Sequence, residues 1–199
     1  MSNYVVTINR QFGSLGRPIA KELAKLLEVE YYDRDIVDKV AKDTNLPVSV
    51  ISSEEETAKS GFFRMKFPLG KGTNDTQDKI YEAQRKIITH IADRESCIIV
   101  GRCSDYVLRN HPNVIRVFIY APYDQRLKNC IENLHMTSEN ARKMIQDVDQ
   151  ARDAYHLRYA KYVPSDLNHN DIIIDSSFLG VEGTATYLAE LVKAKIKGF

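Results

Sequence analysis

Short apolar runs alternate with amphipathic stretches along most of the chain. Several runs are apolar at every position, which is typical of strands covered on both faces. The runs with strand character are Val5–Ile8, Val29–Tyr32, Cys97–Gly101, Val114–Tyr120 and Asp171–Asp175. The stretches with helical spacing are Ile19–Leu27, Asp35–Lys42, Ile80–Glu95, Tyr123–Leu134, Ser138–Tyr162 and Val181–Ile196. This alternation predicts an α/β fold with an open, mainly parallel sheet, helices on both sides and ligands beyond the carboxyl ends of the strands.

One segment interrupts the alternation. Residues 46–78 include Ser-Ser-Glu-Glu-Glu and a Gly- and Phe-containing stretch from Gly61 to Gly72. The segment is too long and irregular for a simple connection, so it is either a functional flap or partly disordered. Its apolar side chains could close over a substrate or dock a partner subunit, and the sequence does not choose between these; they are Phe62, Phe63, Met65 and Phe67.

Composition narrows the class of protein. The chain has 199 residues and 43% hydrophobic content, enough for one well-buried domain over 1–199. Lys and Arg number 28 against 27 Asp and Glu, so no global field favours nucleic acid or an anionic membrane as a partner. The three cysteines have no metal-ligand spacing, and no run of about 18 apolar residues occurs. We therefore expect a cytoplasmic protein, while the choice between monomer and homo-oligomer stays open.

The first strand leads through a glycine-bearing turn directly into the first helix. Gly13 and Gly16 permit backbone conformations that a β-carbon would block, and Pro18 suits a first helical turn. Such a turn gathers free N–H groups at a positive helix terminus, where phosphate binds. Arg17 offers a planar fork for phosphate, and Arg10 and Ser14 add donors.

The turn departs from the phosphate-loop pattern G-x-x-x-x-G-K-[ST] at three positions. Gln11 stands in place of the first glycine, Arg17 in place of the lysine and Pro18 in place of the hydroxyl residue. An ordinary strand-to-helix turn with a solvated arginine is therefore the competing interpretation of the loop.

Six motifs in order along the chain resemble the cytidylate kinase-like family, a branch of the nucleoside monophosphate kinases. They are Arg10–Arg17, Tyr31–Arg34, Val100–Leu108, Val117–Pro122, Asp149-x-x-Arg152 and Asp175–Gly183. The resemblance implies a three-layer P-loop fold with a mainly parallel five-stranded sheet. It also implies an acceptor-binding insertion at 46–78, a helical lid at 138–162, and ATP and Mg²⁺ as cofactors.

The resemblance also implies site residues. The donor phosphates of ATP would bind to Arg10, Gly13, Ser14, Leu15, Gly16 and Arg17. The acceptor would contact Lys39, Arg102, Asp105, Asp149 and Arg158, with Arg17, Arg102 and Arg152 acting on the transferring group. Cys103 replaces the acid of the family's Gly-Arg-Asp motif, and Asp105 lies two residues on. No residue is assigned as a metal ligand, because neither Pro18 nor Ile19 has a hydroxyl.

Several of these residues also have a purely structural interpretation. Asp33 could be a helix cap, and Asp149 and Arg152 could form an exposed i,i+3 ion pair. The series Tyr155, Tyr159 and Tyr162 has the spacing of helix packing rather than base stacking.

Three functions follow. The first is an ATP-dependent phosphotransferase acting on a CMP-like nucleoside monophosphate or a related small phosphate acceptor. The second is a nucleotide-binding regulatory protein whose degenerate loop gives little or no turnover. The third is a kinase for a non-nucleotide metabolite, because Cys103 and the insertion depart from the family on the acceptor side.

Overall fold

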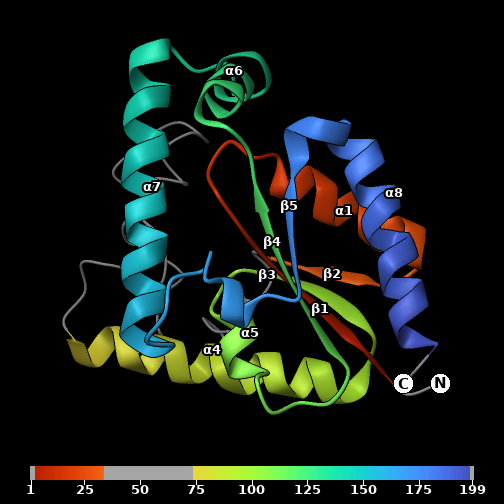
Figure 1. The fold of residues 1–199 in the computed structure, drawn as a ribbon. Helices are drawn as coiled ribbons and strands as arrows, with labels where there is room; N and C mark the ends of the chain where they lie inside the picture. The colour runs from red at the N-terminus through yellow and green to blue at the C-terminus, as the bar shows by residue number, and fades with distance from the viewer. Residues whose placement is uncertain (1–2, 34–73, 198–199) are drawn as a thin grey trace.

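The computed structural model describes residues 3–33 and 74–197, which form a parallel sheet flanked by helices (Figure 1). The five strands lie in the order β2-β3-β1-β4-β5, and every neighbouring pair is parallel. Their bounds are β1 Val5–Arg10, β2 Glu30–Tyr32, β3 Cys97–Val100, β4 Val114–Tyr120 and β5 Ile172–Asp175. The predicted three-layer α/β fold with a five-stranded parallel sheet is therefore confirmed.

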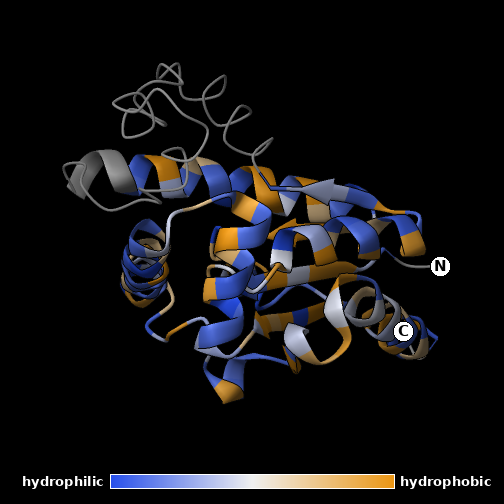
Figure 2. Cartoon of the chain, turned by 90° about the horizontal axis from the view of Figure 1, so that it is seen from above, coloured by the Kyte–Doolittle hydropathy of each residue, from blue (hydrophilic) through white to orange (hydrophobic). Residues whose placement is uncertain are grey.

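Alternate residues of the central strands face different helices. Val6 and Ile8 of β1 belong to a core shared with α1 (Gly16–Leu27) and α8 (Ser176–Ile196). Val5, whose side chain points to the opposite face of the pleat, belongs to a core shared with α4 (Asn74–Arg94). Figure 2 shows the apolar residues gathered on the strands and on the helix faces turned toward them. Burial on both faces explains why these strands are apolar at every position.

The remaining helices follow β3 and β4 or precede β5. They are α5 Ser104–Val107, α6 Tyr123–Leu134, α7 Ser138–Tyr159 and the short 3₁₀ helix η2 Leu167–His169. Phe12, from the loop after β1, is buried in a third core with side chains of α6 and α7, among them Cys130 and Met144. The loop after β1 is thus held from the side by the helix pair α6–α7.

The structure extends several of the predicted elements. Helix α1 begins at Gly16 rather than Ile19, and α8 begins at Ser176 rather than Val181. Gly180 interrupts α8 with φ 65° and ψ −168°, a conformation that is essentially limited to glycine. Because of this interruption, the helical spacing of apolar residues in the sequence begins only at Val181. The sequence pattern missed α5 and η2, which are too short to show a period.

The predicted helix Asp35–Lys42 and residues 46–73 of the predicted insertion lie outside the described residues. The predicted lid, 138–162, corresponds to α7 and the three residues after it. Among the described residues, no helix is long and apolar enough to cross a membrane.

Candidate functional site

The loop after β1 carries the backbone conformations that the glycine pattern predicts. Gly13 has φ 78° and Leu15 has φ 58°, and α1 starts at the next residue, Gly16. Leu15 occupies the N-cap position of α1 without a side-chain cap hydrogen bond. The amino end of α1 is therefore left without the cap that would compete with an anion for its N–H groups.

Contacts from distant segments fix this loop. A β-carbon on Gly13 would lie 2.8 Å from the carbonyl oxygen of Arg126, so α6 packs directly on the glycine. Asn129 Nδ2 donates to the Gly13 carbonyl at 2.8 Å, and Ser176 Oγ donates to the Ser14 carbonyl at 2.7 Å. A loop held from both α6 and α8 needs little reorganisation to bind a ligand.

The Ser14 side chain differs from the sequence expectation. It is 1% exposed, and its hydroxyl donates to the carbonyl oxygen of Gln11 at 2.9 Å. The hydroxyl therefore closes the turn instead of offering an additional donor to a phosphate group. No sequence pattern indicates this hydrogen bond, because the acceptor is a backbone atom.

Arg10, the last residue of β1, lies in the space that two glycines leave open. A β-carbon on Gly16 would lie 2.7 Å from Cβ of Arg10, and one on Gly101 would lie 2.6 Å from Nη1 of Arg10. The pKa of Arg10 is lowered well below its ordinary value, mainly by burial and secondly by the charge of Arg152. The side chain thus runs from the amino end of α1 to the carboxyl end of β3.

Arg17, in the position of the phosphate-loop lysine, pairs with an acid. Its Nε lies 2.6 Å from Oδ2 of Asp33, and its Nη2 donates to Oδ1 at 3.4 Å. Asp33 directly follows β2 and is 5% exposed. Burial would raise the pKa of Asp33, but Arg17, Arg10 and Arg102 together hold it below its ordinary value. A carboxylate thus occupies the guanidinium fork that the sequence assigns to phosphate.

Arg102 lies in a strained turn at the end of β3. Gly101, Arg102 and Cys103 have φ angles of 71°, 59° and 54°, three left-handed residues in succession. Non-glycine residues adopt this region at a cost of about 1–2 kcal/mol each. The charge of Arg102 acts on the pKa of Arg10, Asp33 and Arg152, so its side chain belongs to the same electrostatic neighbourhood.

Asp149 and Arg152 attach α7 to the phosphate loop. Asp149 Oδ1 accepts the N–H of Phe12 at 2.7 Å, and Oδ2 accepts from the Arg126 guanidinium. Arg152 Nη1 donates to the carbonyl of Arg10 at 2.9 Å and lies 3.8 Å from Asp149. Burial lowers the pKa of Arg152 to about 10. The pair is therefore not a solvated i,i+3 ion pair, the competing interpretation of the sequence.

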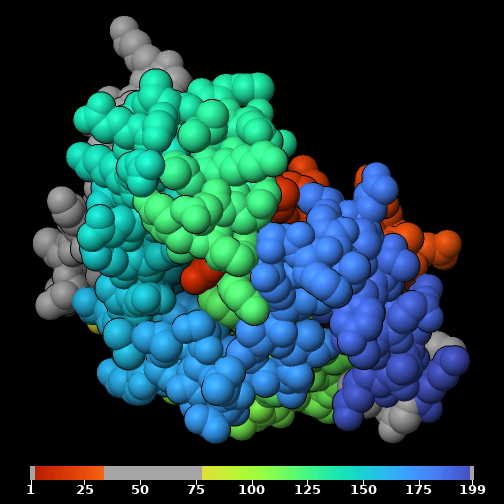
Figure 3. Space-filling model, turned by 45° about the horizontal axis from the view of Figure 1, so that its top comes forward, coloured from red at the N-terminus to blue at the C-terminus, as the bar shows by residue number. Residues whose placement is uncertain are grey.

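Four arginines thus come together around one carboxylate at the carboxyl edge of the sheet. Each arginine comes from a different segment: Arg10 ends β1, Arg17 lies in α1, Arg102 lies in the turn after β3, and Arg152 lies in α7. The carboxylate is that of Asp33, directly after β2. In the space-filling view, only small red patches of the N-terminal segment show between α6–α7 and the blue C-terminal part (Figure 3). Clustered cations are suited to binding a multiply charged anion.

The other expected acceptor residues are placed differently. Asp105 is 1% exposed, and its Oδ2 bonds to His156 and to Tyr162, both at 2.9 Å. Arg158 pairs with Asp78 of α4 at 2.9 Å, towards the end of α7. The structure does not bring Arg158 to the arginine cluster, and it gives Asp105 internal partners. Lys39 lies outside the described residues.

The tyrosines of α7 pack as their spacing predicts. Tyr159 stacks on Tyr81 of α4 with ring centroids 3.9 Å apart, and Tyr155 donates to Gln84 at 2.9 Å. These rings fill the interface between α4 and α7, which leaves their faces occupied by protein.

Asp33 is the site residue whose role the sequence interpretation missed. Its position one residue after a strand, at the ligand-binding edge, was the available signal. Over residues 3–33 and 74–197, the structure contains no group of three or more acidic, histidine or cysteine side chains that could hold a metal ion.

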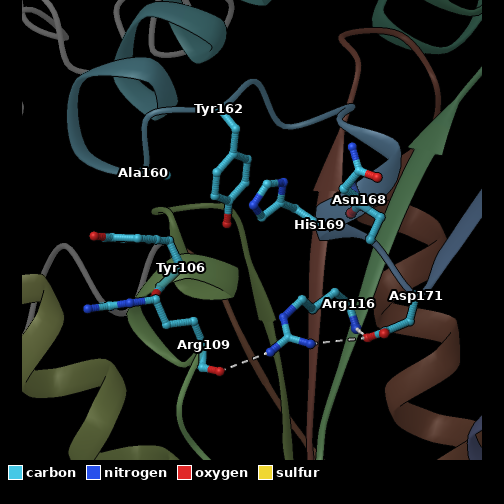
Figure 4. A pocket seen from close by; sticks show the side chains of 9 residues that line it. Tyr106, Arg109, Arg116, Ala160, Tyr162, Asn168, His169 and Asp171 are labelled. Carbon is cyan, nitrogen blue, oxygen red and sulfur yellow. Dashed lines mark hydrogen bonds and ion pairs between the residues drawn. The ribbon is translucent and has the colours of Figure 1, made fainter.

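A separate cavity of about 330 Å³ lies between α5 and the segment before β5 (Figure 4). Its walls include Tyr106, Arg109, Tyr162 and His169, with Arg116 paired to Asp171 at 3.5 Å. Arg116 lies in the first half of β4 and Asp171 just before β5, so the cavity does not include the phosphate loop.

A glycine-bearing loop from β1 into α1, at the centre of a parallel sheet of order 2-3-1-4-5, defines the P-loop kinase class of fold. Comparison with protein families identifies the branch. The model of the cytidylate kinase-like family matches residues 5–178, so the chain belongs to the cytidylate kinase-like family. The resemblance predicted from the sequence motifs is confirmed.

Solved structures agree on the fold. An uncharacterized protein from Eubacterium ventriosum is 25% identical, with TM-score 0.71 over 99% of this chain and 100% of that one. A shikimate kinase from Acinetobacter baumannii is 14% identical, with TM-score 0.53 over 99% and 94% of the two chains. A gluconokinase from Sinorhizobium meliloti is 13% identical, with TM-score 0.52 over 97% of each. A search of curated proteins found no match.

Proposed function

We propose that this protein is an ATP-dependent phosphotransferase that moves the γ-phosphoryl group to a CMP-like nucleoside monophosphate or a related small phosphate acceptor. The observation that carries the proposal is the convergence of Arg10, Arg17, Arg102 and Arg152 beside an uncapped helix terminus. Phosphoryl transfer requires in-line positioning and charge stabilisation rather than covalent chemistry from the protein. A cluster of fixed cations supplies both.

We assign a role to each arginine according to the helix, strand or turn that carries it. The amides at the start of α1 and the fork of Arg17 are placed to hold the donor phosphates. Arg102, directly after β3, is assigned to the acceptor, and Arg152, which donates to the backbone carbonyl of Arg10, is assigned to the transferring group. Arginines so placed stabilise the charge on the transferring group without a general base, because a phosphate acceptor is already ionised.

ATP fits this set of residues, since its phosphates need the cations and N–H groups that the loop collects. Magnesium is expected from the family, and the described residues contain no group of three or more acidic, histidine or cysteine side chains that could hold it. Pro18 has no hydroxyl, and the Ser14 hydroxyl is committed to the Gln11 carbonyl. We therefore derive no step through the metal.

A transfer assay tests this function. The purified protein is incubated with γ-labelled ATP, magnesium and each nucleoside monophosphate in turn, and labelled diphosphate is measured. We expect one monophosphate to give a diphosphate above the rate of ATP hydrolysis, and the Arg102→Gln variant to lose at least about tenfold in rate. Tight ATP binding with no transfer to any acceptor would instead indicate the regulatory function.

A second function, a kinase for a hydroxyl-bearing metabolite, is favoured by Asp33. A buried carboxylate accepts a hydrogen bond from a hydroxyl group but repels a phosphate, and Asp33 lies 2.6 Å from Arg17. The same fold occurs in a shikimate kinase and a gluconokinase, so the fold itself does not favour a nucleotide acceptor. Adding sugars and hydroxy acids to the assay distinguishes the two. In a hydroxyl kinase, Asp33→Asn abolishes transfer; in a monophosphate kinase, it does not.

A further inference from the structure

Four side chains form a buried hydrogen-bonded network between α5, α7 and the segment after α7. Cys103 Sγ lies 3.2 Å from Nδ1 of His156, and Nε2 of His156 lies 2.9 Å from Oδ2 of Asp105. Tyr162 donates its hydroxyl to the same Oδ2 at 2.9 Å. Cys103, Asp105 and His156 are each at most 2% exposed. Together these residues join two segments that are about fifty positions apart along the chain.

The order thiol, imidazole, carboxylate also occurs in cysteine nucleophiles, but here the chemistry is different. A nucleophilic cysteine is exposed and has a lowered pKa. Burial raises the pKa of Cys103 well above its ordinary value, and the charge of Asp105 raises it further. The thiol stays protonated and out of reach of a substrate, so the network does not serve covalent catalysis.

The hydrogen atoms can be assigned from what each group can donate. A carboxylate only accepts, so both Tyr162 and Nε2 of His156 donate to Asp105. The protonated thiol of Cys103 then donates to the remaining ring nitrogen, Nδ1. This assignment gives every hydrogen bond between these groups a donor and an acceptor. Paired donors and acceptors of this kind restrict the geometry of the groups that they join.

The network reaches the site through Cys103. This residue is the third of the left-handed residues Gly101–Cys103, and Arg102 is the second. Left-handed non-glycine residues persist only where the surroundings hold them. The hydrogen bond between Cys103 and His156 stabilises the left-handed conformation of Cys103, the residue directly after Arg102.

The same face of α7 also contacts the phosphate loop. Arg152 and His156 are four residues apart, so they project from one side of the helix. Arg152 bonds to the carbonyl of Arg10, and His156 bonds to Cys103 and Asp105. Helix α7 thus contacts the start of the phosphate loop through Arg152 and the turn that carries Arg102 through His156, one helical turn later.

We propose that Cys103, His156, Asp105 and Tyr162 are positioning residues that set the direction of Arg102 relative to Arg152. The effect of this positioning on catalysis rests on the proposed phosphotransferase function, whereas its effect on the direction of the Arg102 side chain does not. Disturbing the network redirects Arg102 and leaves the phosphate loop intact, because no member of the network bonds to residues 11–17 in the contacts described for this part of the chain.

Arginine side-chain NMR tests the structural consequence without any substrate. The Nε–Hε signal of Arg102 is assigned by its loss in Arg102→Lys. We expect Cys103→Ala to shift this signal, and Cys103→Ser to restore it towards the wild type, because a hydroxyl can donate to Nδ1 of His156. The matched control is Cys97→Ala, a buried cysteine at the opposite end of β3.

A second pair of variants keeps the test valid if Cys103→Ala does not fold. Tyr162→Phe removes one hydroxyl and keeps the ring, which stacks on His169 at 3.6 Å in the wall of the cavity (Figure 4). Tyr159→Phe removes a hydroxyl that bonds to Asp78 instead. We expect the Arg102 signal to move in Tyr162→Phe and not in Tyr159→Phe. An unmoved signal in every folded network variant overturns the proposal.

Kinetics with the acceptor identified in the transfer assay then tests the catalytic consequence. Tyr162→Phe should lower kcat/KM for the acceptor roughly 10- to 100-fold while the KM for ATP stays within about twofold, because only the acceptor-side arginine is misplaced. Tyr159→Phe should match the wild type. An equally large rise in the KM for ATP would show that the network has only a structural role. If no acceptor is found, the phosphotransferase function fails, and the NMR result still decides the positioning.

Discussion

The guanidinium of Arg17 lies 2.6 Å from the carboxylate of Asp33, so the basic residue of the phosphate loop already has an anionic partner. Arg17 is the second residue of α1 and Asp33 follows β2, and the two are joined across the edge where ligands of parallel sheets bind. A phosphate group that binds Arg17 must share its fork with this carboxylate or displace it.

This competition predicts the effect of removing the charge of Asp33. Asp33→Asn should bind pyrophosphate about tenfold more tightly than the wild type, because the fork of Arg17 becomes available; a tenfold change corresponds to about 1.4 kcal/mol. Isothermal titration at low salt measures it. Asp171→Asn makes the same change in net charge at the other edge of the sheet, beside Arg116, and should leave the affinity unchanged. Weaker binding in Asp33→Asn would show that the carboxylate orients Arg17 rather than competing for it.

The lowered pKa of Asp33 predicts a stability difference that depends on pH. A carboxyl whose pKa is lower in the folded than in the unfolded protein contributes stability above its unfolded value of about 4. That contribution is lost as the pH falls through the folded value, which lies lower. The difference in unfolding free energy between the wild type and Asp33→Asn should therefore be constant above about pH 5 and shrink below about pH 4. Urea denaturation across this range measures it, and a difference that grows towards acid contradicts the assigned sign.

The space for the Arg10 side chain predicts a specific effect at Gly101. Gly101→Ala adds a β-carbon 2.6 Å from Nη1 of Arg10, at φ 71°, so it should both destabilise the fold and weaken pyrophosphate binding several-fold. Gly180→Ala is the control, since Gly180 also has positive φ but nothing lies within 4 Å of the added carbon. Both variants should melt at lower temperature. Only Gly101→Ala should lose affinity, and equal affinity in the two would separate Arg10 from the phosphate site.

The buried thiols predict slow chemical labelling. Burial raises the pKa of Cys97 to about 12 and that of Cys130 to about 11, and it raises that of Cys103 as well. A disulfide reagent at pH 8 should therefore modify none of the three cysteines in the folded protein within minutes, and all three in urea. Rapid labelling of Cys103 in the native protein would contradict the closed network around His156.

Much of the site could be predicted from the sequence, because local patterns encode it. The glycine spacing predicted the turn at Gly13–Gly16, and the buried strand before Arg102 placed that residue at the ligand-binding edge. The resemblance added Arg152 on α7. These predictions depend on residues close together in the chain, where the sequence is most informative.

What the sequence could not predict are contacts between distant segments. Phe12 bonds to Asp149 from 137 positions away, and His156 bonds to Asp105 from 51 positions away. The sequence therefore predicts Asp105 as a ligand contact, whereas the structure pairs it with His156 and Tyr162. Asp33 looked like a helix cap, since nothing in the sequence pairs it with Arg17.

We propose that the Gly13–Arg17 loop binds the phosphates of ATP, and titration calorimetry with ATP measures this binding. The measurement compares the wild type with Arg17→Gln, and with Lys25→Gln as a control that removes an exposed cation from the same helix. We expect ATP binding by the wild type, at least about tenfold weaker binding by Arg17→Gln, and unchanged binding by Lys25→Gln. Absence of ATP binding in the wild type, or equal affinity in the wild type and Arg17→Gln, would contradict this proposal.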